Sequence, residues 1–207
     1  MPDLATLALF CAASLVLAIV PGPAVLYIVA SSVGQGRAAG FVSALGVGVG
    51  GLVHVAAATI GLSSLLASSA TAFSIVKYAG AAYLVVLGIL RLLTRDDDAT
   101  VSARPPRPRR RLFLDGVVVN ALNPKTALFF IAFLPQFVEA DGAAASLQIF
   151  ALGLIFVVIA LSSASLWALA AGTLGVWLKE SRAYLAIRRW VTGTVFVVLG
   201  LSAARTT

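Results

Sequence analysis

The chain has 207 residues, of which 60% are hydrophobic and only 11% are charged, whereas about 25% of the residues in a soluble domain are charged. Residues 4–36 and 142–178 contain no Asp, Glu, Lys or Arg. Because a helix needs about 20 apolar residues to cross a membrane, this composition excludes a soluble globular protein. The net charge of +7 is concentrated around residues 91–111, which excludes the spread basic surface of a nucleic-acid-binding protein.

Six transmembrane helices are predicted, over residues 4–33, 41–66, 73–93, 112–135, 147–171 and 186–204. The apolar run 38–76 is too long for one helix, and the serine-rich stretch "SSLLASSATAF" supplies a turn inside it. The predicted fold class is therefore all-α, an integral membrane protein with a single domain over residues 1–207.

The segment 94–111, "TRDDDATVSARPPRPRRR", divides the six helices into two halves of three. Its polar, proline-rich and charged composition predicts a disordered or extended linker, and a binding patch for anionic lipid headgroups is the alternative. Because each half has an odd number of helices, the halves over about 4–93 and 112–204 are expected to be repeats that are inverted in the membrane.

Lys and Arg alternate between the connections of these six helices. The first connection contains Arg37, the third contains the arginine cluster, the fifth contains further basic residues, and the second and fourth contain none. The basic residues of the fifth connection are Lys179, Arg182, Arg188 and Arg189. Basic connections remain in the cytoplasm, so both termini are expected outside.

The first helix is interrupted by the sequence "AIVPGPAVLY" at residues 18–27. Pro21 and Pro23 each remove a backbone donor and disturb a helix at a cost of about 3 kcal/mol or more, and Gly22 lets the backbone bend between them. The sequence predicts a break here, with carbonyl groups at Leu17 and Ile19 that the prolines leave without their usual donors.

The fourth helix has a matching interruption, "NALNPKTALFF", at residues 120–130. Pro124 cannot donate to the carbonyl of Asn120, and Asn123 and Lys125 flank this proline. At a rise of about 1.5 Å per residue, Pro23 and Pro124 both lie roughly 15–18 Å from the cytoplasmic side, near the middle of the bilayer.

Matched breaks in corresponding helices of two inverted halves are typical of a transporter's substrate site. The free carbonyl groups would attract an ammonium group, and the free amide groups would attract a carboxylate. The predicted substrate-binding residues are Pro21, Gly22, Pro23, Asn123, Pro124 and Lys125, and the alternative is that the prolines only kink two helices.

Two ionisable side chains are predicted inside the membrane. Lys125 could pair with a substrate carboxylate, or it could bind backbone carbonyls and hold the break together. His54, the only histidine, is the candidate for carrying a proton, and the alternative is a packing residue in the second helix. Because no Asp or Glu lies at the predicted midplane, proton coupling is expected to use His54 or the substrate itself.

The sequences "PGPAVLYIVASSVGQGRAAGFVSALG", "VKYAGAAYLVVLG" and "NALNPKTALFFIAFLPQF" together resemble the lysine exporter/homoserine–threonine exporter (LysE/RhtB) family. The resemblance implies a six-helix protein of the bacterial inner membrane that exports amino acids, usually with the proton gradient. The chain departs from many members at Ala24 and Gly51, where the resemblance leads one to expect polar or acidic residues.

The remaining classes of function fit less well. An enzyme is not expected, because one histidine, the single Cys11 and no acid at midplane supply neither a nucleophile with its base nor a metal site. No cofactor or metal is expected. A membrane scaffold or assembly subunit without transport activity would explain the hydrophobicity but not the paired breaks. The glycine-rich helix faces would allow a homodimer.

Overall fold

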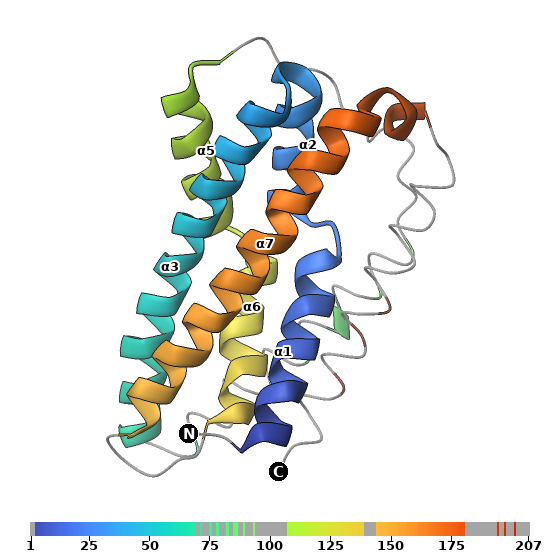
Figure 1. Cartoon of the computed structure of the whole chain (residues 1–207). Coiled ribbons are helices and arrows are strands. Elements are labelled where there is room, and N and C mark those ends of the chain that lie inside the picture. The colour runs from blue at the N-terminus through green and yellow to red at the C-terminus, as the bar shows by residue number, and fades with distance from the viewer. Residues whose placement is uncertain are drawn as a thin grey trace.

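The computed structural model describes residues 3–68, 107–138 and 144–180, together with isolated positions between 71 and 93 and between 194 and 201. Over these residues the chain is all-helical, as predicted (Figure 1). The predicted third and sixth helices, at 73–93 and 186–204, lie almost entirely outside the described residues, as does the greater part of the linker. The elements are α1 (Leu4–Ile19), α2 (Pro23–Gln35), α3 (Arg37–Ser68), α5 (Arg109–Ala121), α6 (Pro124–Leu128), a π-helical segment (Phe129–Phe133), a 3-10 helix (Leu134–Phe137) and α7 (Ala144–Glu180).

Four of the predicted spans are recognisable in these elements. Residues Arg37–Gly61 of α3 and Ala145–Thr173 of α7 are each long and apolar enough to cross a membrane. The pair α1 and α2 is bent by 50° at its break, and α5 is bent by 43° relative to Pro124–Phe137. Each bent pair is long and apolar enough to form one broken span, and the bends lie in the two helices where the proline motifs predicted a break.

The connection between α2 and α3 is shorter than predicted. Residues 34–40 were expected to form a loop, but Gly36 alone separates the two helices, and α3 begins at Arg37 rather than at residue 41. Gly36 has a φ of 83°, a left-handed conformation that only glycine adopts without a Cβ clash. One glycine is therefore sufficient to reverse the chain direction here.

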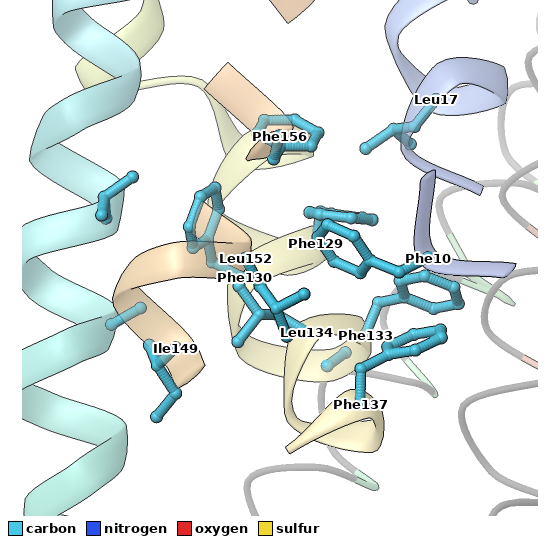
Figure 2. Close-up of a cluster of buried hydrophobic side chains, with 13 residues drawn as sticks. Phe10, Leu17, Phe129, Phe130, Phe133, Leu134, Phe137, Ile149, Leu152 and Phe156 are labelled. Carbon is cyan, nitrogen blue, oxygen red and sulfur yellow. The ribbon is translucent and has the colours of Figure 1, made fainter. Parts of the chain in front are cut away.

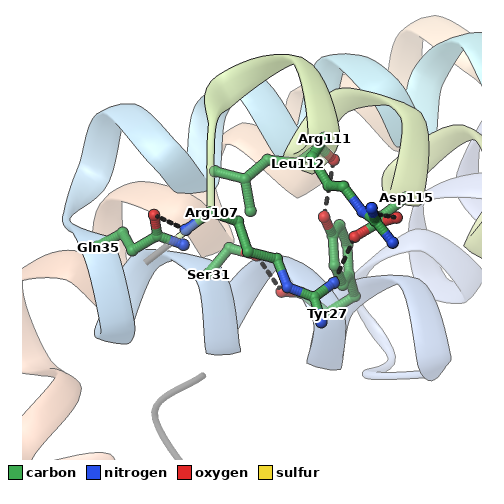
Figure 3. Close-up of polar contacts among 7 residues, drawn as sticks. All are labelled: Tyr27, Ser31, Gln35, Arg107, Arg111, Leu112 and Asp115. Carbon is green, nitrogen blue, oxygen red and sulfur yellow. Dashed lines mark hydrogen bonds and ion pairs between the residues drawn. The ribbon is translucent and has the colours of Figure 1, made fainter. Parts of the chain in front are cut away.

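The end of the charged linker is also more ordered than predicted. The backbone amide of Arg107 donates to Gln35 Oε1 over 2.8 Å, and Arg107 Nη1 pairs with Asp115 Oδ2 over 2.6 Å (Figure 3). Arg111 lies 3.9 Å from the same carboxylate. Because these contacts fix the chain, residues 109–111 are the first turn of α5 rather than disordered linker.

Asp115 therefore lies between two arginines that precede it in the chain, Arg107 and Arg111. Beside this pair, the Tyr27 hydroxyl donates to the Leu112 carbonyl over 2.7 Å (Figure 3). Helix α2 is thus joined to the start of α5.

The fifth predicted helix is also longer than expected. Helix α7 extends over Ala144–Glu180 instead of 147–171. The sequence after residue 171 remains apolar through Leu178 and contains no proline, so nothing in it stops the helix. Lys179, which was assigned to a connection, is therefore part of α7.

The two broken spans run in opposite directions. In Figure 1, α1 leads upward to α2, whereas α5 leads downward to α6, and the two breaks lie at the middle of the bundle. Helix α3 packs mainly against α5 and α7. A Cβ added at Gly46 or Gly50 would collide with the backbone carbonyl of Phe113 or Val117 in α5. These glycines therefore permit the close packing of α3 against α5.

A cluster of buried aromatic side chains holds the lower half of α1 against the segment that follows the second break. The rings of Phe129 and Phe156 stack with centroids 4.5 Å apart, and Phe10 contacts Phe137 edge to face at 5.3 Å (Figure 2). Pro135 cannot donate to the carbonyl of Ile131, so the α-helix does not continue regularly here, and the chain passes through π-helical and 3-10 turns. The cluster anchors one side of the break region.

Candidate functional site

The first break comprises residues 20–22, between α1 and α2. Val20 is extended, with φ −63° and ψ 121°, and Gly22 is the extended N-cap of α2, with Pro23 in the first turn. Gly22 makes no side-chain cap hydrogen bond, so the first amide groups of α2 are not satisfied by a capping side chain. The break therefore presents carbonyl groups at the end of α1 and amide groups at the start of α2, as predicted.

The second break comprises Leu122 and Asn123, between α5 and α6. The Asn123 side chain caps α6 by accepting a hydrogen bond from the Lys125 amide over 3.1 Å. The carbonyl of Asn120, which Pro124 deprives of its helical donor, accepts a hydrogen bond from His54 Nε2 over 2.7 Å. Each break thus has a proline at the start of the following helix.

Lys125 joins the two breaks. Its Nζ donates to the carbonyl oxygens of Leu17 and Val20, each over 2.5 Å, and the side chain is buried. A Cβ added at Gly22 would lie 3.0 Å from Lys125 Cδ, so glycine is what lets the lysine side chain cross the first break. This geometry corresponds to the second alternative for Lys125, in which it binds backbone carbonyls; contact with a substrate remains a prediction.

Side chains bind several carbonyl groups at the two breaks. Of the three carbonyls that the prolines were expected to leave without their usual donors, those of Leu17 and Asn120 accept side-chain hydrogen bonds. Around the third, Ile19, side chains bind the neighbouring carbonyls of Ala18 and Val20. The Ala18 carbonyl accepts from Ser163 Oγ of α7 over 3.0 Å.

Asn120 is the residue that the sequence analysis missed. Its Nδ2 donates to the Val47 carbonyl over 2.7 Å, and its Oδ1 accepts from Asn123 Nδ2 over 3.2 Å and from Thr126 Oγ1 over 3.1 Å. From the sequence, only its backbone carbonyl was expected to take part in the break. The sequence feature that could have indicated Asn120 is the repeated asparagine in "NALN", because residues three apart lie on one face of a helix.

His54 lies beside this network. The ring is buried, it donates to the Asn120 carbonyl, and it stacks on Phe130 with centroids 5.9 Å apart. Since a carbonyl oxygen only accepts, Nε2 carries the proton of this hydrogen bond. This placement agrees with the alternative in which His54 is a packing residue. The role of His54 as a proton carrier stays a prediction.

A cavity of about 50 Å³ lies between the breaks. Of the predicted site residues, Gly22, Asn123 and Lys125 line it, whereas Pro21, Pro23, Pro124 and His54 do not. Its described lining contains no carboxylate. The lining combines polar residues, including Asn120 and Thr126, with apolar ones. The apolar lining residues include Val25, Ile28, Val47, Phe156, Ala160 and Ala164.

Comparison with known proteins gives a consistent family assignment. The sequence profile of the LysE-type translocators matches residues 15–207. The chain is 30% identical over 194 residues to an uncharacterised membrane protein of Pseudomonas aeruginosa, covering 91% of this chain and 90% of that protein.

Two further relatives have descriptive names. The homoserine/homoserine lactone efflux protein of Salmonella typhimurium is 29% identical over 194 residues, or 93% of each chain. The leucine efflux protein of Salmonella choleraesuis is 30% identical over 135 residues, or 65% of this chain and 64% of that protein. No solved structure matches the chain significantly.

Proposed function

Because the chain belongs to the LysE-type translocator family, we propose that it exports small amino acids or related zwitterions across the bacterial inner membrane by alternating access. Two relatives that match it are named as efflux proteins, one for homoserine and its lactone and one for leucine. The proposed substrate-binding residues are those of the two breaks: Pro21, Gly22, Pro23, Asn123, Pro124 and Lys125.

The observation that carries this proposal is the direct contact between the breaks. Lys125 of the second break binds carbonyl oxygens of the first, and both breaks line one cavity. The end of α1 supplies acceptors for an ammonium group, and the uncapped start of α2 supplies donors for a carboxylate. A zwitterion carries both of these groups.

The size of the cavity indicates which state the structure represents. Ligand pockets are typically about 300–1,000 Å³ in volume, whereas this cavity has about 50 Å³. An amino acid can enter only if the α1–α2 pair moves relative to α5 and α6. We therefore assign the structure to a closed state of the transport cycle, with Arg107 and Tyr27 holding α2 and α5 together at one end.

The orientation proposed from the sequence is supported by the distribution of basic residues. Arg37 begins α3 just after Gln35, and Gln35 binds the Arg107 backbone, so the first connection and the end of the arginine-rich linker lie at one end of the bundle. This end would face the cytoplasm. The opposite directions of the two broken spans in Figure 1 support the inverted arrangement of the two halves.

The proposal also includes coupling of export to the proton gradient. The described cavity lining has no carboxylate, so a coupled proton would be carried by His54 or by the substrate itself. Asn120 links His54 to the cavity, because it lines the cavity and accepts the histidine hydrogen bond. Rearrangement of the second break would expose His54 to the cavity.

Efflux from proteoliposomes tests the proposed function. Vesicles containing the purified protein are loaded with a mixture of the common amino acids, and the amino acids released are quantified by mass spectrometry with and without an imposed pH gradient. We expect release of one or a few neutral amino acids above the rate of protein-free vesicles. Equal release from both kinds of vesicle would contradict amino-acid export.

A further inference from the structure

We infer that the carbonyl oxygens of Leu17 and Val20 form the subsite for the α-ammonium group of the substrate, and that Lys125 fills this subsite in the closed state as an ammonium group of the protein itself. The inference rests on the proposed function and specifies its substrate class. It makes Lys125 a specificity-determining residue, because the substrate must exchange places with it.

The geometry of the subsite supports this assignment. Both carbonyl oxygens lie 2.5 Å from Lys125 Nζ, and they stand at the end of α1, where the helix dipole is negative. The Leu17 carbonyl has no helical donor, because Pro21 occupies the position that would supply it. An ammonium group with three donors satisfies these acceptors in the same way, whether it belongs to Lys125 or to a ligand.

The exchange keeps the charges of the cavity paired only for one class of ligand. When the α-ammonium group of an amino acid binds the two carbonyls, the displaced ammonium group of Lys125 meets the α-carboxylate. Ala24 and Val25 at the start of α2 line the same cavity, and we expect their backbone amide groups to donate to that carboxylate. Both charges of the ligand then have partners.

Ligands with only one of the two groups leave a charge unpaired. A simple amine would displace Lys125 and place two positive charges in a cavity whose described lining has no carboxylate. A simple carboxylate would withdraw Lys125 and leave the carbonyls of Leu17 and Val20 without a donor. Unpaired buried polar groups are costly, so both kinds of ligand should bind poorly. The apolar remainder of the lining fits a neutral side chain.

The first test uses the variant Lys125→Ala and needs no knowledge of the substrate. Alanine keeps Cβ, so n-propylammonium chloride supplies the missing part of the lysine side chain. We expect this ion to raise the melting temperature of purified Lys125→Ala. Tetramethylammonium, which has the charge but no N–H donor, should not do so, and neither ion should stabilise the wild type. Equal effects of the two ions on Lys125→Ala, or no effect of either, would overturn the inference.

The second test uses only the wild-type protein, so it remains decisive if the alanine variant does not fold. Thermal stability is measured with each common amino acid, and an amino acid that stabilises the protein is compared with the amine that lacks its carboxylate. We expect the amine to bind at least about tenfold more weakly, since a charge-assisted hydrogen bond is lost. An amine that binds as tightly as its amino acid would overturn the exchange.

The two tests separate the inference from the proposed function. If no amino acid binds or is exported, the proposed function fails, and the response of Lys125→Ala to n-propylammonium still decides whether Leu17 and Val20 form an ammonium subsite. If amino acids are exported but n-propylammonium has no specific effect on Lys125→Ala, the export function stands and the subsite is wrong.

Discussion

Replacing Asn120 with alanine should weaken the whole second break, because one side chain serves three hydrogen bonds there. Its Nδ2 binds the Val47 carbonyl, and its Oδ1 accepts from both Asn123 and Thr126. Side-chain hydrogen bonds inside membrane proteins contribute about 0.6 kcal/mol each on average. Loss of the three therefore predicts a free energy of unfolding about 2 kcal/mol lower than that of the wild type.

The assay is thermal unfolding of the purified protein in detergent, followed by efflux from proteoliposomes. For a chain of this length, about 2 kcal/mol corresponds to a melting temperature roughly 4–8 °C lower. Thr126→Val is the matched control, because it removes only the hydrogen bond to Asn120 Oδ1 and should lower the melting temperature by about a third as much.

A double variant sharpens the test. Asn120→Ala and Thr126→Val both remove the hydrogen bond between these two residues. The double variant should therefore lose less stability than the sum of the losses in the two single variants. If Asn120→Ala has the melting temperature of the wild type and exports at the wild-type rate, Asn120 does not organise the second break, and the reasoning from its contacts is refuted.

Three further predictions concern the first break, the proton and the orientation. Gly22→Ala should reduce efflux, because its Cβ would lie 3.0 Å from Lys125 Cδ. The control is Gly61→Ala, whose Cβ meets nothing within 4 Å. Equal efflux from the two variants would argue against a functional role for the close approach of Gly22 and Lys125. His54→Gln should export with a weaker response to an imposed pH gradient, and an undiminished response would exclude His54 as the proton carrier. A cysteine replacing Ser102 should be unreactive to an impermeant thiol reagent applied outside intact cells, and labelling there would reverse the proposed orientation.

The breaks could be predicted from the sequence because their causes are local. Pro21, Pro23 and Pro124 remove backbone donors wherever the chain places them, and Gly22 bends without a side-chain clash. The structure confirms both breaks, at residues 20–22 and 122–123, and shows Lys125 joining them. The all-helical fold followed equally directly from the apolar runs.

The partners of the freed groups could not be predicted, because they come from distant parts of the chain. His54 and the Asn120 carbonyl are 66 residues apart, and Lys125 and the Val20 carbonyl are 105 residues apart. Only the packing of α3 and α7 around the breaks brings such groups together. Likewise, no local pattern showed that Gly36 alone would connect two helices, since the loop composition around it was also compatible with a longer turn.

The central claim, that the paired breaks form the substrate site of an exporter, is tested most directly by the efflux rate of Lys125→Ala in proteoliposomes. The rate is measured for an amino acid that the wild type exports, at matched protein content and after the variant's insertion has been verified. The account predicts that the variant releases this amino acid no faster than protein-free vesicles do. Release at the wild-type rate would contradict it, and would reduce the contact between Lys125 and the first break to a structural role.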